Sequence, residues 1–159
     1  MVAARILVAR RLVRRLRPGR RHGTLLARLL GVLFLAMAAG QLSDMPGFRA
    51  ILADYRWGDP ELLSIALLGG ELLAGGWLLF SPRRDPMVPA AVFAATALLW
   101  SGLAVQAFAR GLVVENCGCF GVHLGQSLGW PVLVQDGLLL LYAAVLLRRA
   151  RTRRGWPFR

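Results

Sequence analysis

The sequence predicts an all-α integral membrane protein, in which four transmembrane helices form one bundle. Of its 159 residues, 57% are hydrophobic, and the mean hydropathy is +0.54. A soluble domain is usually less apolar. Four apolar runs cover about residues 25–42, 62–80, 88–108 and 128–147. Each run approaches the ~20 residues that a helix needs to cross ~30 Å of hydrocarbon.

The runs also contain features that favour packed membrane helices. Arg28 lies one turn inside the first run, where an arginine can extend its charged group to the interface. Small residues recur every four positions in the second and third runs, a spacing that lets helices approach closely in lipid. These residues are Ala66, Gly70 and Ala74, then Ala90 with Ala94 and Ala91 with Ala95. An antiparallel bundle is expected.

The arginines indicate how the chain crosses the membrane. The net charge is +12, and all twenty cations are arginines. Most precede the first run, follow the last or lie in "SPRRDP" between the second and third. The positive-inside rule therefore places both termini in the cytoplasm and the loops at about 43–61 and 110–127 outside. We expect a bacterial inner-membrane protein whose arginines contact anionic lipid, rather than nucleic acid, because no aromatic residues alternate with them.

The chain is divided into three parts by these features. Residues 1–23 form a cytoplasmic arginine-rich arm, residues 24–148 the membrane domain and residues 149–159 a basic tail. The arm mixes apolar residues with arginine at helical spacing, so it is either an interfacial helix or a disordered segment. The start of the chain also resembles a signal peptide, but the apolar run continues beyond the potential cleavage site "AMA".

Two acidic residues interrupt the apolar runs. Glu71 lies in the middle of the second run and Asp136 in the fourth. A carboxylate facing lipid costs at least ~2.5–3.5 kcal/mol, so both are expected to face the bundle interior. Gln41, near the outer end of the first run, is a natural hydrogen-bond partner. These polar residues either fasten the helices together or take part in proton or ligand binding.

The segment "ENCGCFGVH" contains both cysteines of the chain, Cys117 and Cys119, in the second outer loop. Disulfides persist in the oxidising extracytoplasmic compartment. Bridging residues i and i+2 requires a contracted backbone, because the Cα atoms of a disulfide are usually 4.4–6.8 Å apart. The neighbours Asn116, Gly118 and Gly121 supply backbone freedom. The resulting ring is expected to be strained and exposed, which favours exchange over structural stabilisation.

Two other interpretations of the cysteine pair remain open. Cys117, Cys119 and His123 offer the soft ligands that Cu(I) or zinc prefers, but this loop supplies no obvious fourth ligand for a closed zinc site. The cysteines are otherwise two unbonded small residues that fill a loop. No metal site is therefore assigned, and His123 is expected to be an ordinary interfacial histidine.

The string "NCGCFG", followed by "GWPVLVQDGLLLL", resembles the methylamine utilisation protein MauE family and the wider DoxX-like membrane family. The resemblance includes Phe120 within the cysteine segment, and it extends over about residues 25–148 through "LLGVLFLAMAAGQLSDMPGFRAILADY" and "LLGGELLAGGWLLF". This chain has Gln41 where the wider family often has lysine, and Gln135 where an arginine is frequent. The long basic N-terminus is also additional.

This resemblance implies an accessory role in the maturation, disulfide formation or transport of a periplasmic redox enzyme, such as the methylamine dehydrogenase small subunit. A thioredoxin-like periplasmic partner is implied as well. Thiol–disulfide exchange at Cys117 and Cys119 would suit this role. No cofactor is evident; a quinone is conceivable but has no firm signature. The alternatives are a small transporter or metal-handling protein that uses the Cys/His loop and the intramembrane acids, and a scaffold for a redox complex.

Overall fold

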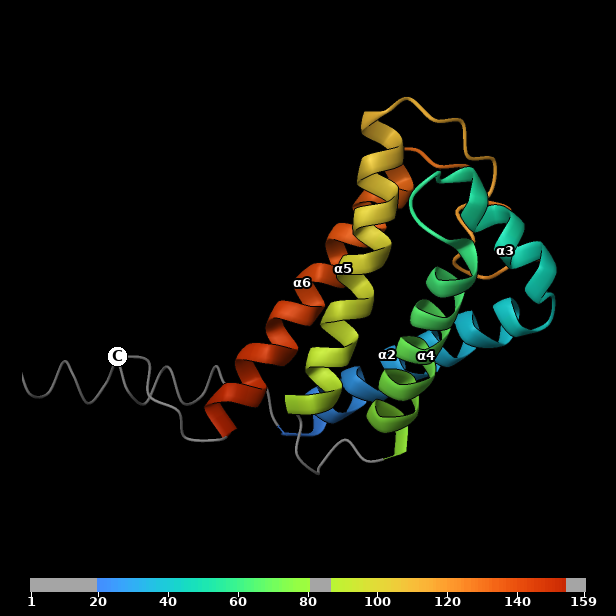
Figure 1. Ribbon diagram of the computed structural model, residues 1–159. Coiled ribbons are helices and arrows are strands. Elements are labelled where there is room, and N and C mark those ends of the chain that lie inside the picture. Colours follow the sequence, from blue (N-terminus) through green and yellow to red (C-terminus); the bar gives the residue numbers. More distant parts are fainter. Residues whose placement is uncertain (1–19, 81–86, 154–159) are drawn as a thin grey trace, which may run out of the picture.

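The computed structural model describes residues 20–80 and 87–153. This part of the chain contains five α-helices and no β-strand (Figure 1). The helices are α2 (Arg20–Leu42), α3 (Met45–Asp54), α4 (Pro60–Phe80), α5 (Met87–Ala109) and α6 (Trp130–Arg153). All but α3 are long and apolar enough to cross a membrane. The predicted all-α fold with four transmembrane helices is therefore confirmed.

The ends of the helices differ in places from the predicted runs. Helix α6 continues to Arg153, so the predicted basic tail begins as helix. Helix α2 begins at Arg20, which lies within the predicted arm. The remainder of that arm, at residues 1–19, lies outside the described residues, as do "SPRRDP" at residues 81–86 and the last residues of the tail.

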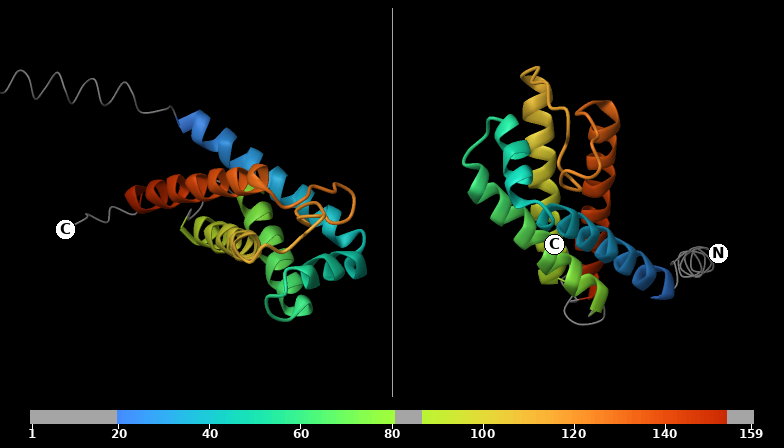
Figure 2. Two further views of the ribbon diagram at one scale, coloured as in Figure 1. Left: turned by 90° about the horizontal axis from the view of Figure 1, so that it is seen from above. Right: turned by 90° about the vertical axis from the view of Figure 1, so that its right-hand side faces the viewer.

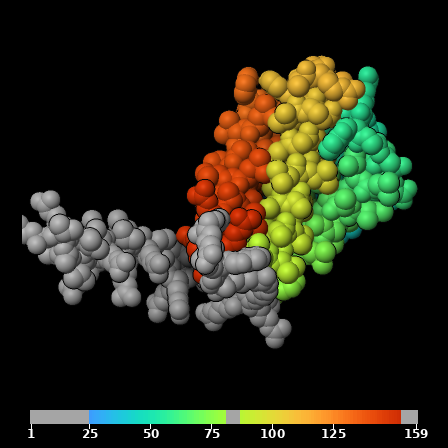
Figure 3. All heavy atoms as spheres, turned by 60° about the vertical axis from the view of Figure 1, so that its left-hand side comes forward, coloured from blue at the N-terminus to red at the C-terminus, as the bar shows by residue number. Residues whose placement is uncertain are grey.

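Helices α4, α5 and α6 form a row that α2 crosses at an angle (Figure 2). Helix α2 packs on α4, α4 on α5 and α5 on α6. A space-filling view shows α4, α5 and α6 side by side on one face (Figure 3). Because successive long helices run in opposite directions, α3 and the segment 110–129 gather at one end of the bundle. The described start of α2 and the end of α6 lie at the other end.

The short helix α3 turns the chain between α2 and α4. Asp44 caps its N-terminus, where its side chain accepts a hydrogen bond from the Gly47 backbone N–H at 3.0 Å. The helix buries Phe48 and Leu52 on its inner side. It therefore covers the end of the bundle at which the cysteine segment lies.

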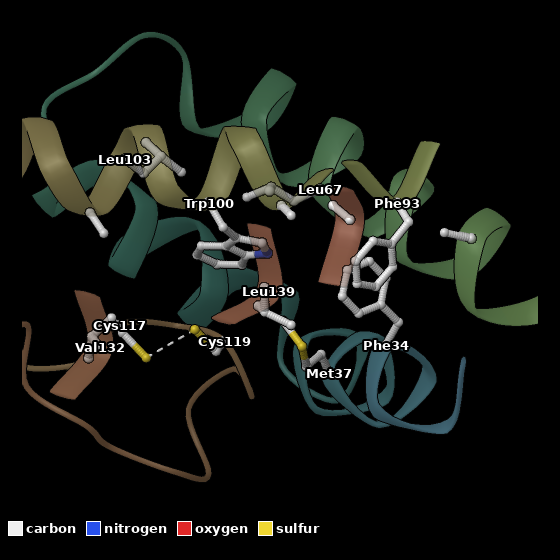
Figure 4. Close-up of a cluster of buried hydrophobic side chains, with 14 of the residues drawn as sticks. Phe34, Met37, Leu67, Phe93, Trp100, Leu103, Cys117, Cys119, Val132 and Leu139 are labelled. Carbon is white, nitrogen blue, oxygen red and sulfur yellow. Dashed lines mark hydrogen bonds between the residues drawn. The ribbon is translucent and has the colours of Figure 1, made fainter. Parts of the chain in front are cut away.

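Side chains complete the core where the helix backbones are farther apart. The rings of Phe34 from α2 and Phe93 from α5 stack with centroids 4.4 Å apart, an arrangement that contributes ~0.5–1.5 kcal/mol beyond area burial. Figure 4 shows Met37 from α2 and Leu139 from α6 between this stack and the cysteines. The core thus extends without interruption from the aromatic pair to Cys119.

Small residues allow close helix contacts at several of the predicted positions, although Ala66 on α4 is exposed. On α4, a Cβ at Gly70 would collide with the Thr96 hydroxyl of α5. On α5, Ala90 and Ala94 are buried. The parallel series Ala91 and Ala95 is instead exposed, because only one of the two stripes faces the other helices. A close approach of α2 to α4 depends on Gly31, which the predicted spacing did not include: its Cβ would lie 2.8 Å from the Gly75 carbonyl oxygen and 2.8 Å from the Leu79 nitrogen.

Replacing Gly31 with alanine should therefore separate α2 from α4. Both colliding atoms belong to the backbone, so a helix must move, and overpacking of this kind costs ~1–3 kcal/mol. Gly76→Ala is the matched control, because a Cβ there meets nothing within 4 Å and alanine favours helix. Thermal unfolding in detergent should show a lower midpoint for Gly31→Ala and no decrease for Gly76→Ala. Equal midpoints would contradict the close approach.

Candidate functional site

The cysteines lie in a tight turn that follows α5. Gly118 and Gly121 adopt positive φ angles of 79° and 64°, which glycine accommodates without strain. Asn116 closes the turn, because its side-chain oxygen accepts a hydrogen bond from the Gly118 N–H and its side-chain nitrogen donates to the Gly121 carbonyl, both at 3.0 Å. Asn116 was expected to supply backbone freedom, but its side chain instead fixes the turn.

Backbone hydrogen bonds hold the turn to the segment that returns towards α6. The Cys117 N–H donates to the Gln126 carbonyl at 2.7 Å, and the Leu128 N–H donates to the Val114 carbonyl at 2.9 Å. The chain therefore leaves α5 and enters α6 through a closed loop rather than an open one. This closure fixes the position of the cysteine pair relative to both helices.

The two sulfur atoms lie close enough to interact directly. Both cysteines are free, and their Sγ atoms are 3.2 Å apart and within hydrogen-bond distance (Figure 4). A disulfide bond is ~2.05 Å long, so the pair is a dithiol whose sulfurs already face one another. Closing the bond needs a small movement within the turn.

The pair is buried, whereas the sequence led us to expect exposed sulfurs. Cys117 is 2% exposed and Cys119 is 4% exposed. The reason is that the turn inserts into the bundle: a Cβ at Gly118 would lie 3.0 Å from Ile51, 3.5 Å from Phe48 and 3.7 Å from Trp100. Another protein can therefore reach the sulfurs only if the loop moves.

Contacts on two sides anchor the turn to the rest of the molecule. The hydroxyl of Tyr55, at the end of α3, donates to the Cys117 carbonyl at 2.9 Å. Burial raises the pKa of Tyr55, so this hydroxyl remains a donor at physiological pH. On the other side, the turn packs on α2, where a Cβ at Gly40 would lie 2.5 Å from the Phe120 carbonyl oxygen.

His123 lies on the outer side of the loop. Its Nε2 atom is 2.6 Å from the Ser43 hydroxyl, at the end of α2. His123 therefore contacts the residue that follows α2. Within residues 20–80 and 87–153, no group of three or more histidine, cysteine, aspartate or glutamate side chains is placed to hold a metal ion.

The two thiols differ in acidity. The pKa of Cys117 is lowered to about 7, mainly because the side chain of Cys119 hydrogen-bonds to its thiolate. This effect outweighs burial, which raises the pKa. The same hydrogen bond and burial raise the pKa of Cys119 well above its usual value. Cys117 is therefore the thiol that is ionised at neutral pH.

A cluster of buried polar side chains lies beneath the turn. Glu71 Oε1 accepts hydrogen bonds from Gln41 Nε2 at 3.1 Å and from Trp100 Nε1 at 2.8 Å. The same Gln41 nitrogen is 3.3 Å from the Cys119 carbonyl oxygen. Gln41 and Glu71 are completely buried. Gln41, which was expected to be a partner for the intramembrane acids, contacts Glu71, and the pair is also connected to the cysteine turn.

Sequence reasoning missed Trp100 and Tyr55 as members of the site. Trp100 lies in an apolar run that predicts a membrane helix, and Tyr55 lies in a predicted outer loop. The available signal was chemical: a buried indole N–H or phenol hydroxyl usually has a hydrogen-bond partner. The partners are Glu71 and the Cys117 carbonyl.

Asp136 is buried in α6 and does not join the hydrogen bonds of Gln41 and Glu71. It nevertheless lies close enough to the cysteines for its negative charge to oppose ionisation of both Cys117 and Cys119. The structure thus brings both intramembrane acids to the cysteine end of the core, on different helices.

Replacing Tyr55 with phenylalanine should loosen the turn. The buried Cys117 carbonyl would lose its hydroxyl donor, at a cost on the order of 1–3 kcal/mol, and more open loop would be populated. Maleimide should then modify the cysteines about tenfold faster, which corresponds to ~1.4 kcal/mol. Tyr142→Phe is the matched control on α6. An unchanged labelling rate in Tyr55→Phe would show that the hydroxyl does not hold the turn.

Comparison with known proteins identifies the family. The family described as methylamine utilisation protein MauE matches residues 21–149. Comparisons with curated proteins and with solved structures found no match. The matched region contains the cysteine turn and nearly all of the four apolar helices. The chain is therefore a multi-pass membrane protein that belongs to the MauE family.

Proposed function

We propose that this protein is a MauE-like membrane accessory that carries out thiol–disulfide exchange for the maturation, disulfide formation or transport of a periplasmic redox enzyme. The observation that carries the proposal is the pair of free sulfurs of Cys117 and Cys119, which face one another at 3.2 Å. A cross-link over one intervening residue adds little chain-entropy stabilisation. Reversible oxidation therefore explains the adjacent cysteines better than a stabilising cross-link does.

The exchange has two steps. The Cys117 thiolate attacks a disulfide of the partner, forming a mixed disulfide and releasing one partner sulfur as a thiolate, which takes up a proton. Cys119 then loses its proton and attacks Cys117 Sγ, which forms the Cys117–Cys119 disulfide and releases the second partner sulfur. The pair loses two electrons, and the partner disulfide gains them. The reverse steps transfer the disulfide to a partner dithiol.

The acidity of the thiols supports this order of attack. Cys117 has a pKa of about 7 and is the better thiolate at neutral pH. Cys119 remains protonated and hydrogen-bonded beside it. This assigns Cys117 as the attacking thiol and Cys119 as the resolving thiol.

Burial of the pair supports a restricted choice of partners. Small oxidants and unrelated proteins meet a loop held by Tyr55 and packed on Gly40, so they react only during its brief openings and therefore slowly. A cognate protein that binds the loop and displaces it would gain access. We propose a thioredoxin-like periplasmic protein as this partner, and a methylamine dehydrogenase small subunit or an analogous enzyme as the client.

The proposed setting is the bacterial inner membrane. Arginine near the chain ends and in the loop between α4 and α5 favours a cytoplasmic location for these segments. The opposite end of the bundle, with α3 and the cysteine turn, would then face the periplasm. Anionic lipid at the cytoplasmic side would attract the basic termini.

Serine substitutions should separate the two thiol roles. With oxidised glutathione as the probe, Cys119→Ser should accumulate a stable mixed disulfide at Cys117, because no resolving thiol remains, while the serine hydroxyl can still donate to the thiolate. Cys117→Ser should form little mixed disulfide, because it lacks the attacking thiol. The initial rate for Cys119→Ser should rise with pH and level off above about 7, as the Cys117 thiol ionises.

Intact-mass measurement on acid-quenched samples reports the mixed disulfide, and the double serine variant is the control. Accumulation in Cys117→Ser alone would reverse the assigned roles. Absence of any mixed disulfide in either single variant, and of the internal disulfide in the unsubstituted protein, would contradict thiol–disulfide exchange.

Orientation is testable with reporter cysteines in the double serine background. Val113 is 87% exposed near the cysteine end, and Phe80 is 79% exposed at the end of α4 on the opposite side. In spheroplasts, an impermeant maleimide should label Val113→Cys directly and Phe80→Cys only after permeabilisation. The opposite pattern would place the cysteine turn in the cytoplasm and contradict the proposed setting.

A further inference from the structure

We propose that Glu71 is the buried proton acceptor for Cys119, taking up the thiol proton on Oε2 when Cys119 resolves the mixed disulfide. This inference rests on the proposed function and adds a residue to the same site. Its basis is the hydrogen bonding of Glu71, Gln41 and Trp100, which leaves one carboxyl oxygen of Glu71 available.

The two oxygens of Glu71 have different surroundings. Oε1 receives two N–H donors, from Gln41 and Trp100, which is how a buried carboxylate is stabilised. Oε2 is buried and has no hydrogen-bond partner among the described residues. A buried acceptor without a donor is costly, and it is also an open position for a proton.

The protonated form of Glu71 has a partner available as well. Gln41 Oε1 is the second buried atom of this cluster without a partner in the described part of the chain. Gln41 already contacts Glu71 through its amide nitrogen. The amide oxygen lies in the same planar group as that nitrogen. A hydroxyl on Oε2 that turned towards that oxygen would give it a donor. The cluster therefore accommodates Glu71 both with and without a proton.

The cluster is attached to the backbone of the residue whose thiol must lose its proton. Gln41 Nε2 contacts both Glu71 Oε1 and the Cys119 carbonyl, so the carboxyl and Cys119 belong to one buried group. In a low-dielectric interior, additional charge is expensive. Moving the proton from Cys119 to Glu71 leaves the net charge of this group unchanged, whereas releasing it to solvent adds an unpaired negative charge.

The proton and electrons balance within the exchange step. The Cys119 Sγ–H bond breaks, and its proton forms an O–H bond on Glu71 Oε2, directly or through one water. The remaining electron pair on Cys119 Sγ forms the bond to Cys117 Sγ, and the partner sulfur leaves as a thiolate. In the reverse reaction, Glu71 returns the proton to Cys119.

Other ionisable groups in this region do not have the same position. Asp136 approaches from α6, Tyr55 from the end of α3, and Cys117 from the turn itself. These groups interact electrostatically with one another or with Cys119. Tyr55 donates to the Cys117 carbonyl. Asp136 is not attached to the Cys119 backbone. Glu71 is the acid joined to Cys119 through Gln41.

Glu71→Gln tests the proposal, because glutamine preserves the shape and can accept from Gln41 and Trp100 and donate to Gln41 Oε1. It therefore resembles the protonated state but cannot accept a proton. With oxidised glutathione, attack by Cys117 should keep its rate, while resolution by Cys119 should slow by about 10²-fold, within the usual range for a lost general base. The mixed disulfide should accumulate although both cysteines are present.

The pH dependence provides a second readout. In Glu71→Gln, the resolution rate should increase with pH, because solvent base must remove the proton from a thiol whose pKa is raised. The unsubstituted protein should depend less on pH. Glu71→Asp keeps an acid and should recover part of the resolution rate. Glu61→Gln is the matched control, since Glu61 lies on the same helix and its side chain is 63% exposed.

The outcomes separate this inference from the proposed function. If Cys119→Ser traps the mixed disulfide but Glu71→Gln resolves it at the unsubstituted rate, exchange stands and Glu71 only fastens the helices. If Glu71→Gln slows attack and resolution equally, its effect is structural and the inference is also wrong. If no variant forms a mixed disulfide or an internal disulfide, the proposed function and this inference both fail.

Discussion

The hydrogen bonds to Glu71 Oε1 are the constraint on which the cysteine end of this molecule depends. A carboxyl buried within a membrane helix needs donors, and Gln41 from α2 and Trp100 from α5 provide them. Three helices are thus fixed around one oxygen atom. Gln41 extends the connection to the Cys119 carbonyl, so the position of the cysteine turn is coupled to the position of the helices.

Burial gives the cysteine pair a different character from that of an exposed redox motif. The turn occupies space between α3 and α5 and is held by Tyr55. Reactivity then depends on two separate quantities: how often the loop opens, and how readily the Cys117 thiol ionises. The first allows selection of a partner, and the second allows attack at neutral pH. A protein of the MauE family with this arrangement can react slowly until its partner binds and opens the loop.

The fold was predictable because hydrophobic length and small-residue spacing are local properties of the sequence. The pairing of Gln41 with Glu71 was also predictable, since a buried acid needs a donor and few polar residues are available in the apolar runs. The burial of Cys117 and Cys119 was not predictable: it depends on how a loop folds back against α3, and no local pattern encodes that contact. Likewise, the asymmetry between the thiols arises from the 3.2 Å approach of their sulfurs, which sequence spacing permits but does not require.

The most direct test of the account is a redox titration of the purified protein. The unsubstituted protein would be equilibrated with glutathione buffers of graded redox potential, quenched with acid and measured by intact mass. The account predicts one two-electron transition, in which the protein loses two hydrogen atoms and peptide mapping finds Cys117 joined to Cys119. A pair that remains a dithiol throughout, or that acquires only glutathione adducts without an internal disulfide, would contradict the claim that these neighbouring sulfurs exchange a disulfide.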